Sequence, residues 1–200
     1  MVGNLVRVEP LSMDHAEDLT ATAEGDRSSF GFTRVPRGSE EIEDYLRDQL
    51  GRADQGELIP FAQVRLADGR SVGSTSYLSM RFRPEKPDPF AVEIGSTWLG
   101  ASAQRTGINA ETKLLLLEHA FETWSVARVD LKTDARNIRS RNAIEGLGAQ
   151  FEGILRNWQP SLVAGEEGRY RDSAMFSILD SEWAETKARL RKRLSLYSVT

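Results

Sequence analysis

The sequence contains no cysteine among its 200 residues and only two histidines, His15 and His119. Without cysteine the chain has no disulfide, no catalytic thiol and no thiolate ligand for a metal. Two histidines are too few for a His-rich metal centre, so we expect no metal site. The absence of cysteine also fits a cytoplasmic protein, and this is the location that we expect.

Long hydrophobic runs are missing as well. There is no stretch of about 18 apolar residues, so we expect no membrane-spanning segment. Residues 1–10 lack the basic and apolar regions of a secretory signal. The 26 Lys and Arg against 30 Asp and Glu give a formal net charge of −4. This balance argues weakly against a general nucleic-acid binder, although it leaves room for a local basic site that binds a phosphate ligand.

The chain length suits one domain, with or without a short tail. Period-2 and helix-period segments predict the order β-α-α-β-β-β-α-β-α-β-β-α. The expected strands are 6–11, 59–66, 71–82, 90–99, 126–132, 151–158 and 170–179, and the expected helices are 14–24, 39–51, 107–125, 137–147 and one from 181. Gly51 and Gly148 are expected to end the second and fourth helices. The order predicts an α/β (α+β) fold, a mixed sheet with helices on both faces.

The most informative segment runs from Trp98 to Lys113 and joins a predicted strand to the longest predicted helix. A helix start carries unpaired N–H groups and about half a positive charge, which favour an anion. Gly107 lets the backbone come close to a ligand, and Arg105 adds positive charge. The segment has neither the GK[ST] of a Walker loop nor the glycines of a dinucleotide fingerprint. An anion site is therefore slightly favoured over a plain polar loop.

The run Gln104-Arg-Thr-Gly107-Ile-Asn109-Ala110 resembles the Q/R-x-x-G-x-G/A pyrophosphate loop of the GNAT N-acetyltransferase superfamily, with Asn109 in the last Gly/Ala position. The resemblance continues through segments on both sides, namely 93–99, 114–121, 134–148, 152–153, 171–179 and 182–183. The series is similar to the RimJ/RimL-type (ribosomal-protein-alanine acetyltransferase-like) branch, which acetylates protein N-termini and small amines. We therefore expect a GNAT acyltransferase domain over 1–184 and a basic C-terminal helix or tail over 185–200.

The resemblance implies a mostly antiparallel sheet with two splayed central parallel strands, here 90–99 and 126–132. It also implies acetyl-CoA, or another acyl-CoA such as succinyl-CoA, as co-substrate, and no metal. The pantetheine arm would pair with the first of these strands, and the pyrophosphate would meet the N–H groups of the loop. The implied cofactor-binding residues are Thr97, Trp98, Leu99, Gln104, Arg105, Thr106, Gly107, Asn109, Ala110, Asn137 and Ser140.

Acyl transfer to an amine needs a proton acceptor, because alkylamines are mostly protonated at neutral pH. Glu93 is our candidate, since it faces away from the core if Ile94 faces the core. A surface or ion-pair role for Glu93 is about equally supported. Ser140 is the candidate that gives a proton to the thiolate or holds its sulfur. Gln159 stands where relatives of this branch carry a carboxylate, and glutamine cannot be a base.

Residues 27–37 are expected to form a loop that borders the acceptor site, although a plain surface loop is about as well supported. Phe30 and Phe32 suggest an apolar wall, and Arg34 suggests a contact to an acid group. The expected acceptor is a small-molecule amine or a protein N-terminus, and the resemblance is compatible with a homodimer. With no cysteine and no evident Ser-His pair, we expect direct attack in a ternary complex. The alternative is a non-catalytic CoA-binding sensor or scaffold with the same fold.

Overall fold

The computed structural model describes residues 1–197. Its strands form one sheet in the order β1-β2-β3-β4-β5-β7-β6. They are β1 (Val6–Pro10), β2 (Leu58–Arg65), β3 (Ser71–Phe82), β4 (Pro89–Leu99), β5 (Arg128–Asp134), β6 (Gln150–Pro160) and β7 (Tyr170–Leu179). The α-helices are α1 (Ala16–Ala23), α2 (Gly38–Asp54), α3 (Ile108–Glu118), α4 (Ile138–Glu145) and α5 (Asp180–Leu194). Strands and helices follow one another as predicted, and the α/β (α+β) class is confirmed.

The sheet is antiparallel except where β4 meets β5. These two strands pair in parallel only between 91–93 and 128–130, and no pairing continues beyond Glu93. On its other side, β4 stays paired with β3 as far as Leu99. The two central strands therefore separate, and residues 94–99 keep one backbone edge without a neighbouring strand. This confirms the expected mostly antiparallel sheet with a splayed central parallel pair.

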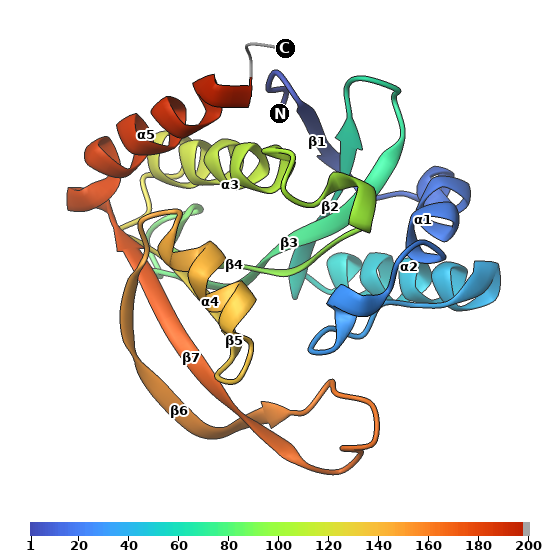
Figure 1. The fold of residues 1–200 in the computed structure, drawn as a ribbon. Helices are drawn as coiled ribbons and strands as arrows, with labels where there is room; N and C mark the ends of the chain where they lie inside the picture. Colours follow the sequence, from blue (N-terminus) through green and yellow to red (C-terminus); the bar gives the residue numbers. More distant parts are fainter. Residues whose placement is uncertain (198–200) are drawn as a thin grey trace.

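Helices cover both faces of the sheet (Figure 1). On one face α3 packs beside α5, above a core that includes Val92 and Ile94. On the other face α1 packs beside α2, above a second core that includes Val64 and Trp98. Since neighbouring side chains of a strand point to opposite faces, Glu93 lies on the face away from α3.

A bulge in β4 interrupts this alternation at the point where the strand leaves β5. The register between β3 and β4 shifts between Ser76 and Ser74, and Ser96 has a φ of +47°. A bulge inserts a residue and redirects the side chains that follow. As a result, Thr97 faces α3, where it meets Lys113, while Trp98 faces α1 and α2.

Several predicted element boundaries are wrong, and α4 is among them because it ends at Glu145, before Gly148. α2 passes through Gly51 to Asp54, and the left-handed residue after it is Gly56, with a φ of +74°. The predicted helix over 107–125 is α-helical only to Glu118 and continues as a π-helical segment, His119–Thr123. Such a wide turn brings residues five apart onto one face, and the rings of His119 and Trp124 lie 4.7 Å apart. β5 begins two residues later than predicted, because the N–H of residue 126 bonds back to residue 120.

α5 runs without a break across residue 184, and Leu190 and Leu194 belong to the main core. The division into a domain over 1–184 and a tail over 185–200 stays a prediction, and its residues 198–200 lie outside the described residues. Within residues 1–197, none of the helices combines the length and the apolar character that a bilayer crossing requires.

One buried carboxylate joins the start of the chain to α3. Glu111 is 4% exposed and accepts hydrogen bonds from the N–H groups of Asn4, Leu5 and Val6 at 2.8, 2.6 and 2.9 Å. Because an amide offers a single uncharged acceptor, we expect Glu111→Gln to lower the free energy of unfolding by about 2 kcal/mol in urea denaturation. The exposed Glu40 gives the control, since Glu40→Gln should change it by less than about 0.5 kcal/mol. Equal effects of the two substitutions would contradict this prediction.

Candidate active site

A cavity of about 890 Å³ opens where β4 and β5 separate. Ligand pockets are typically of this size. One part, the helix end, lies at the start of α3 and beside α4, and is lined by Gln104, Arg105, Gly107, Asn109, Ala110, Asn137, Arg139, Ser140, Arg193 and Tyr197. The other part, the hairpin end, lies on the opposite face of the sheet and toward β6 and β7, and is lined by Leu78, Glu93, Lys132, Gln159, Leu162 and Arg171.

The helix end is built around a glycine that no other residue can replace without strain. Gly107 precedes α3 with a φ of +88°, and a Cβ there would lie 2.8 Å from Leu5 and 3.0 Å from Tyr197. Among the hydrogen bonds of the described residues, none has a backbone N–H of residues 108–110 as its donor. These N–H groups and the helix dipole together make the start of α3 a site suited to an anion.

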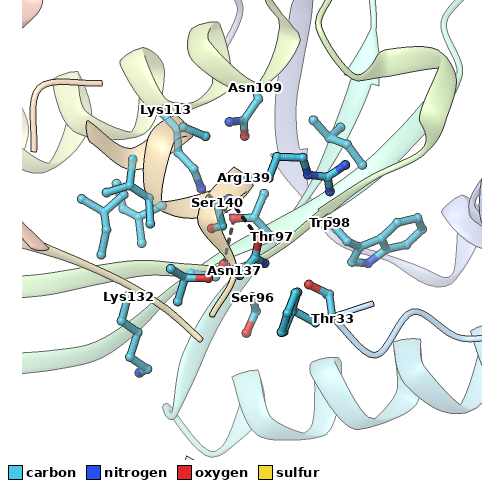
Figure 2. A pocket seen from close by; sticks show the side chains of 18 of the residues that line it. Thr33, Ser96, Thr97, Trp98, Asn109, Lys113, Lys132, Asn137, Arg139 and Ser140 are labelled. Carbon is cyan, nitrogen blue, oxygen red and sulfur yellow. Dashed lines mark hydrogen bonds between the residues drawn. The ribbon is translucent and has the colours of Figure 1, made fainter. Parts of the chain in front are cut away.

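α4 brings two of the predicted residues to the same space. Asn137 caps the helix, with its Oδ1 accepting the N–H of Ser140 at 3.0 Å. Both side chains line the cavity, and Figure 2 shows them converging with Thr97 of β4. Arg139 lies between them in sequence and donates to the carbonyl of Ser29 at 2.8 Å, so it ties α4 to the 27–37 loop.

All but one of the predicted cofactor-binding residues line the cavity. The exception is Thr106, because its hydroxyl turns back to the carbonyl of Ala103 at 2.6 Å. Gln104 lines the cavity but also braces the fold, since its amide donates to Leu99 and Ser29 at 2.8 Å each. Trp98 is mostly a core residue, and its indole packs edge-on against Phe30.

The sequence interpretation missed a buried lysine in α3. Lys113 is 5% exposed, lines the cavity and donates to the hydroxyls of Thr97 at 2.6 Å and Thr75 at 3.1 Å (Figure 2). Burial lowers the pKa of Lys113 to about 7. The sequence did carry a signal that Lys113 is buried, because Ala110 and Leu117 flank Lys113 on the same apolar helix face. The cavity also gains Arg193 from the basic end of α5.

At the hairpin end, Glu93 is 5% exposed, and its Oε2 accepts a hydrogen bond from Lys132 at 2.6 Å. The core position of Ile94 confirms the predicted orientation of Glu93, and the ion pair considered as the alternative is also present. Within the described residues, Oε1 of Glu93 accepts no hydrogen bond. Gly95 makes room for it, since a Cβ there would lie 2.8 Å from this oxygen. Glu93 thus has one oxygen fixed and one free to accept a proton.

Gln159 and Arg171 pair across β6 and β7 at the same end. With its amide oriented to satisfy both groups, Gln159 Oε1 accepts from Arg171 Nη2 at 2.8 Å and from Nε at 3.3 Å. Arg171 is 8% exposed, and burial lowers the pKa of its guanidinium. Gln159 lines the cavity at this end.

The 27–37 loop contributes Phe30, Phe32 and Thr33 to the cavity wall. Arg34 is exposed and does not line the cavity, so the structure does not bring it to the site where we expected a contact to an acid group. The reason is that Val35 is buried in the core beneath α1 and α2, and the chain therefore turns away from the cavity after Thr33. Among residues 1–197, no group of three or more His, Asp and Glu side chains is placed to hold a metal ion.

Comparisons with known proteins point to one family. Residues 6–150 match the family model for the Acetyltransferase (GNAT) domain. The curated protein uncharacterized N-acetyltransferase p20 from Bacillus licheniformis is 30% identical over 92 residues, which are 46% of this chain and 48% of that protein. The matched part thus spans about half the length of that relative.

The fold is shared with solved structures. A GCN5-related N-acetyltransferase from Brucella melitensis has a TM-score of 0.82 and 29% identity, with 96% of this chain and 83% of that chain covered. RimJ of Mycobacterium smegmatis, solved with CoA-disulfide, has a TM-score of 0.75 and 19% identity over 95% of this chain and 93% of that chain. At that identity the second likeness shows the fold alone. With a family model spanning most of its length, a splayed central strand pair and a glycine-led helix start, this chain belongs to the GNAT acetyltransferase family.

Proposed function

We propose that this protein transfers an acyl group, most simply acetyl, from acyl-CoA to a primary amine by direct attack in a ternary complex. The observation that carries the proposal is the unsatisfied N–H groups of residues 108–110 beside the free edge of β4. A diphosphate fits such a helix start. The amide-containing arm of acyl-CoA, which leads away from the diphosphate, fits a strand edge that lacks a neighbouring strand. The helix start and the unpaired edge of β4 together support acyl-CoA as the donor of the activated acyl group.

The side chains around the gap have separate tasks in this proposal. The free Oε1 of Glu93 accepts the proton that the amine must lose before it attacks. Ser140 holds the sulfur or gives a proton to the leaving thiolate, with its helix fixed by the Asn137 cap. Arg105, Arg139 and Arg193 line the helix end and supply positive charge for phosphate groups. Because the N–H groups of residues 108–110 have no acceptor within residues 1–197, no hydrogen bond has to break before a phosphate binds them.

The acceptor in this proposal is a small-molecule amine or a protein N-terminus that enters at the hairpin end. Phe30, Phe32 and Thr33 form one wall of that entrance. The protein would act in the cytoplasm, and a homodimer belongs to the same proposal. These points rest on the family resemblance and on the absence of cysteine.

The helix end can be tested by titration calorimetry with acetyl-CoA, succinyl-CoA and CoA. We expect micromolar binding of at least one of them to the wild-type protein. Asn109→Asp should weaken it at least about tenfold, because the new carboxylate repels the diphosphate at short range. The same carboxylate in the first turn of α3 favours the helix dipole, so the melting temperature should not fall. Weaker binding with an unchanged melting temperature then shows that the variant is folded and has lost only its affinity for the ligand.

A wild-type protein that binds none of the three ligands would overturn the proposed function. A second candidate function, a CoA-binding module without catalysis, is favoured by Gln159 in place of a carboxylate. It predicts tight binding of acetyl-CoA and no thiol release with any amine or peptide. Turnover with one acceptor excludes it.

A further inference from the structure

The hairpin end contains a buried cation that lacks an ionic partner. Arg171 is 8% exposed and lines the cavity. Within residues 1–197, the hydrogen bonds of its guanidinium go to the amide oxygen of Gln159, and no carboxylate forms an ion pair with it. Its Nη1 group has no acceptor among these residues. These unpaired donors belong to a residue that lines the cavity.

The carboxylates around Arg171 are committed to other cations. Asp134 pairs with Arg136 at 2.8 Å, and Arg136 also binds Glu166 at 2.7 Å. Glu93 pairs with Lys132 at 2.6 Å. Each of these cations already has a carboxylate in direct contact, and Arg171 has a neutral amide instead. The difference is chemical, since glutamine holds a guanidinium in place without neutralising it.

A buried guanidinium with spare donors is a binding site for a planar anion. Arginine binds carboxylates through two parallel N–H···O bonds, and such charge-assisted bonds gain strength away from water. A carboxylate in the place of Gln159 would satisfy Arg171 internally. Gln159 fixes the Nε side of the guanidinium and leaves the other side for a ligand.

We propose that the acceptor is a molecule of the amino-acid type, with a carboxylate close to its amino group, and that Arg171 binds this carboxylate. The inference rests on the proposed function. Glu93 lines the same end of the cavity as Arg171. A ligand held by its carboxylate at Arg171 therefore has its amino group in the part of the cavity that Glu93 also lines. A protein N-terminus lacks a backbone carboxylate beside its amine, and fits this site less well.

The test uses product pairs that differ only in the carboxylate. N-acetylglycine, N-acetyl-L-alanine and N-acetyl-L-methionine are compared with their amides by calorimetry on the full chain saturated with CoA. The wild type should bind at least one acid about tenfold or more tightly than its amide. In Arg171→Gln this preference should fall by about 10-fold to 100-fold, and Arg171→Lys should keep part of it. Arg52→Gln is the matched control, because Arg52 lines the same cavity but pairs with Glu57.

Titration with CoA distinguishes a failure of the carboxylate site at Arg171 from a failure of the proposed function. CoA affinity should be equal in the wild type and in all three variants, since Arg171 lies at the other end of the cavity. If CoA binds and the wild type shows no preference for any acid, or Arg171→Gln keeps the preference, the carboxylate site is overturned and the proposed function stands. Failure of CoA to bind would overturn both. If Arg171→Gln does not fold, the reduced preference of Arg171→Lys decides.

Discussion

Glu93→Gln is expected to lower kcat/KM for amine acylation by about 10²-fold to 10⁴-fold at neutral pH, with acetyl-CoA affinity unchanged. The amide keeps the shape of the side chain but cannot take the proton that the amine must lose. The residual rate should rise with pH as more of the acceptor becomes neutral in solution. Thiol release, followed with the best acceptor over a range of pH, measures both effects.

Substitutions at two residues near Glu93 provide comparison variants for this experiment. Asp130 is its register partner on β5 but does not line the cavity, so Asp130→Asn should leave the rate within about threefold. Gly95→Ala keeps the carboxylate chemically intact but places a Cβ 2.8 Å from its free oxygen. The end of a glutamate side chain can move, so this variant should fold and lose activity to an intermediate degree. A Glu93→Gln enzyme as active as the wild type would remove Glu93 from the mechanism without affecting the family assignment.

Local patterns were sufficient to predict the scaffold. Alternation placed Ile94 in the core and Glu93 on the opposite face, and the loop before α3 was identified by its glycine and its neighbours. Each of these features depends on residues within a few positions along the chain. The errors at the ends of α2 and α3 are also local. The helix α2 continues through Gly51, and the π-helical segment after α3 carries no simple sequence signal.

The chemistry of the cavity depended on contacts between distant segments, and single-sequence patterns do not give these. Arg171 and Gln159 meet only because β6 and β7 pair in one particular register. Arg193 reaches the helix end because α5 packs beside α3. Arg34 was expected at the acceptor site, but burial of its neighbour Val35 decides where the loop goes. The residue types were visible in the sequence, whereas their partners were not.

Lys113→Met should make the protein more stable at pH 6, by about 3 kcal/mol, and this gain should shrink as the pH rises and become a loss of about 2 kcal/mol by pH 10.5. Burial lowers the pKa of Lys113 from 10.5 to about 7, so the folded state disfavours the charged form. Above pH 10.5 the lysine is neutral in both states and costs nothing. Between pH 10.5 and 7 only the unfolded chain holds the proton, so the stability of the wild type falls as the pH is lowered, and below pH 7 the cost stays constant.

At about 1.4 kcal/mol per pH unit, the interval from 10.5 to about 7 corresponds to a swing of about 5 kcal/mol. The net gain at pH 6 is smaller because two hydrogen bonds of about 1 kcal/mol each are lost. Thr75 and Thr97 still bond each other at 2.7 Å after the substitution, so neither hydroxyl is left unsatisfied. Urea denaturation at pH 6, 8 and 10 measures the swing, with the exposed Lys86→Met as a control that should show none. A gain that did not depend on pH would mean that packing, and not the buried charge, sets the stability at this position.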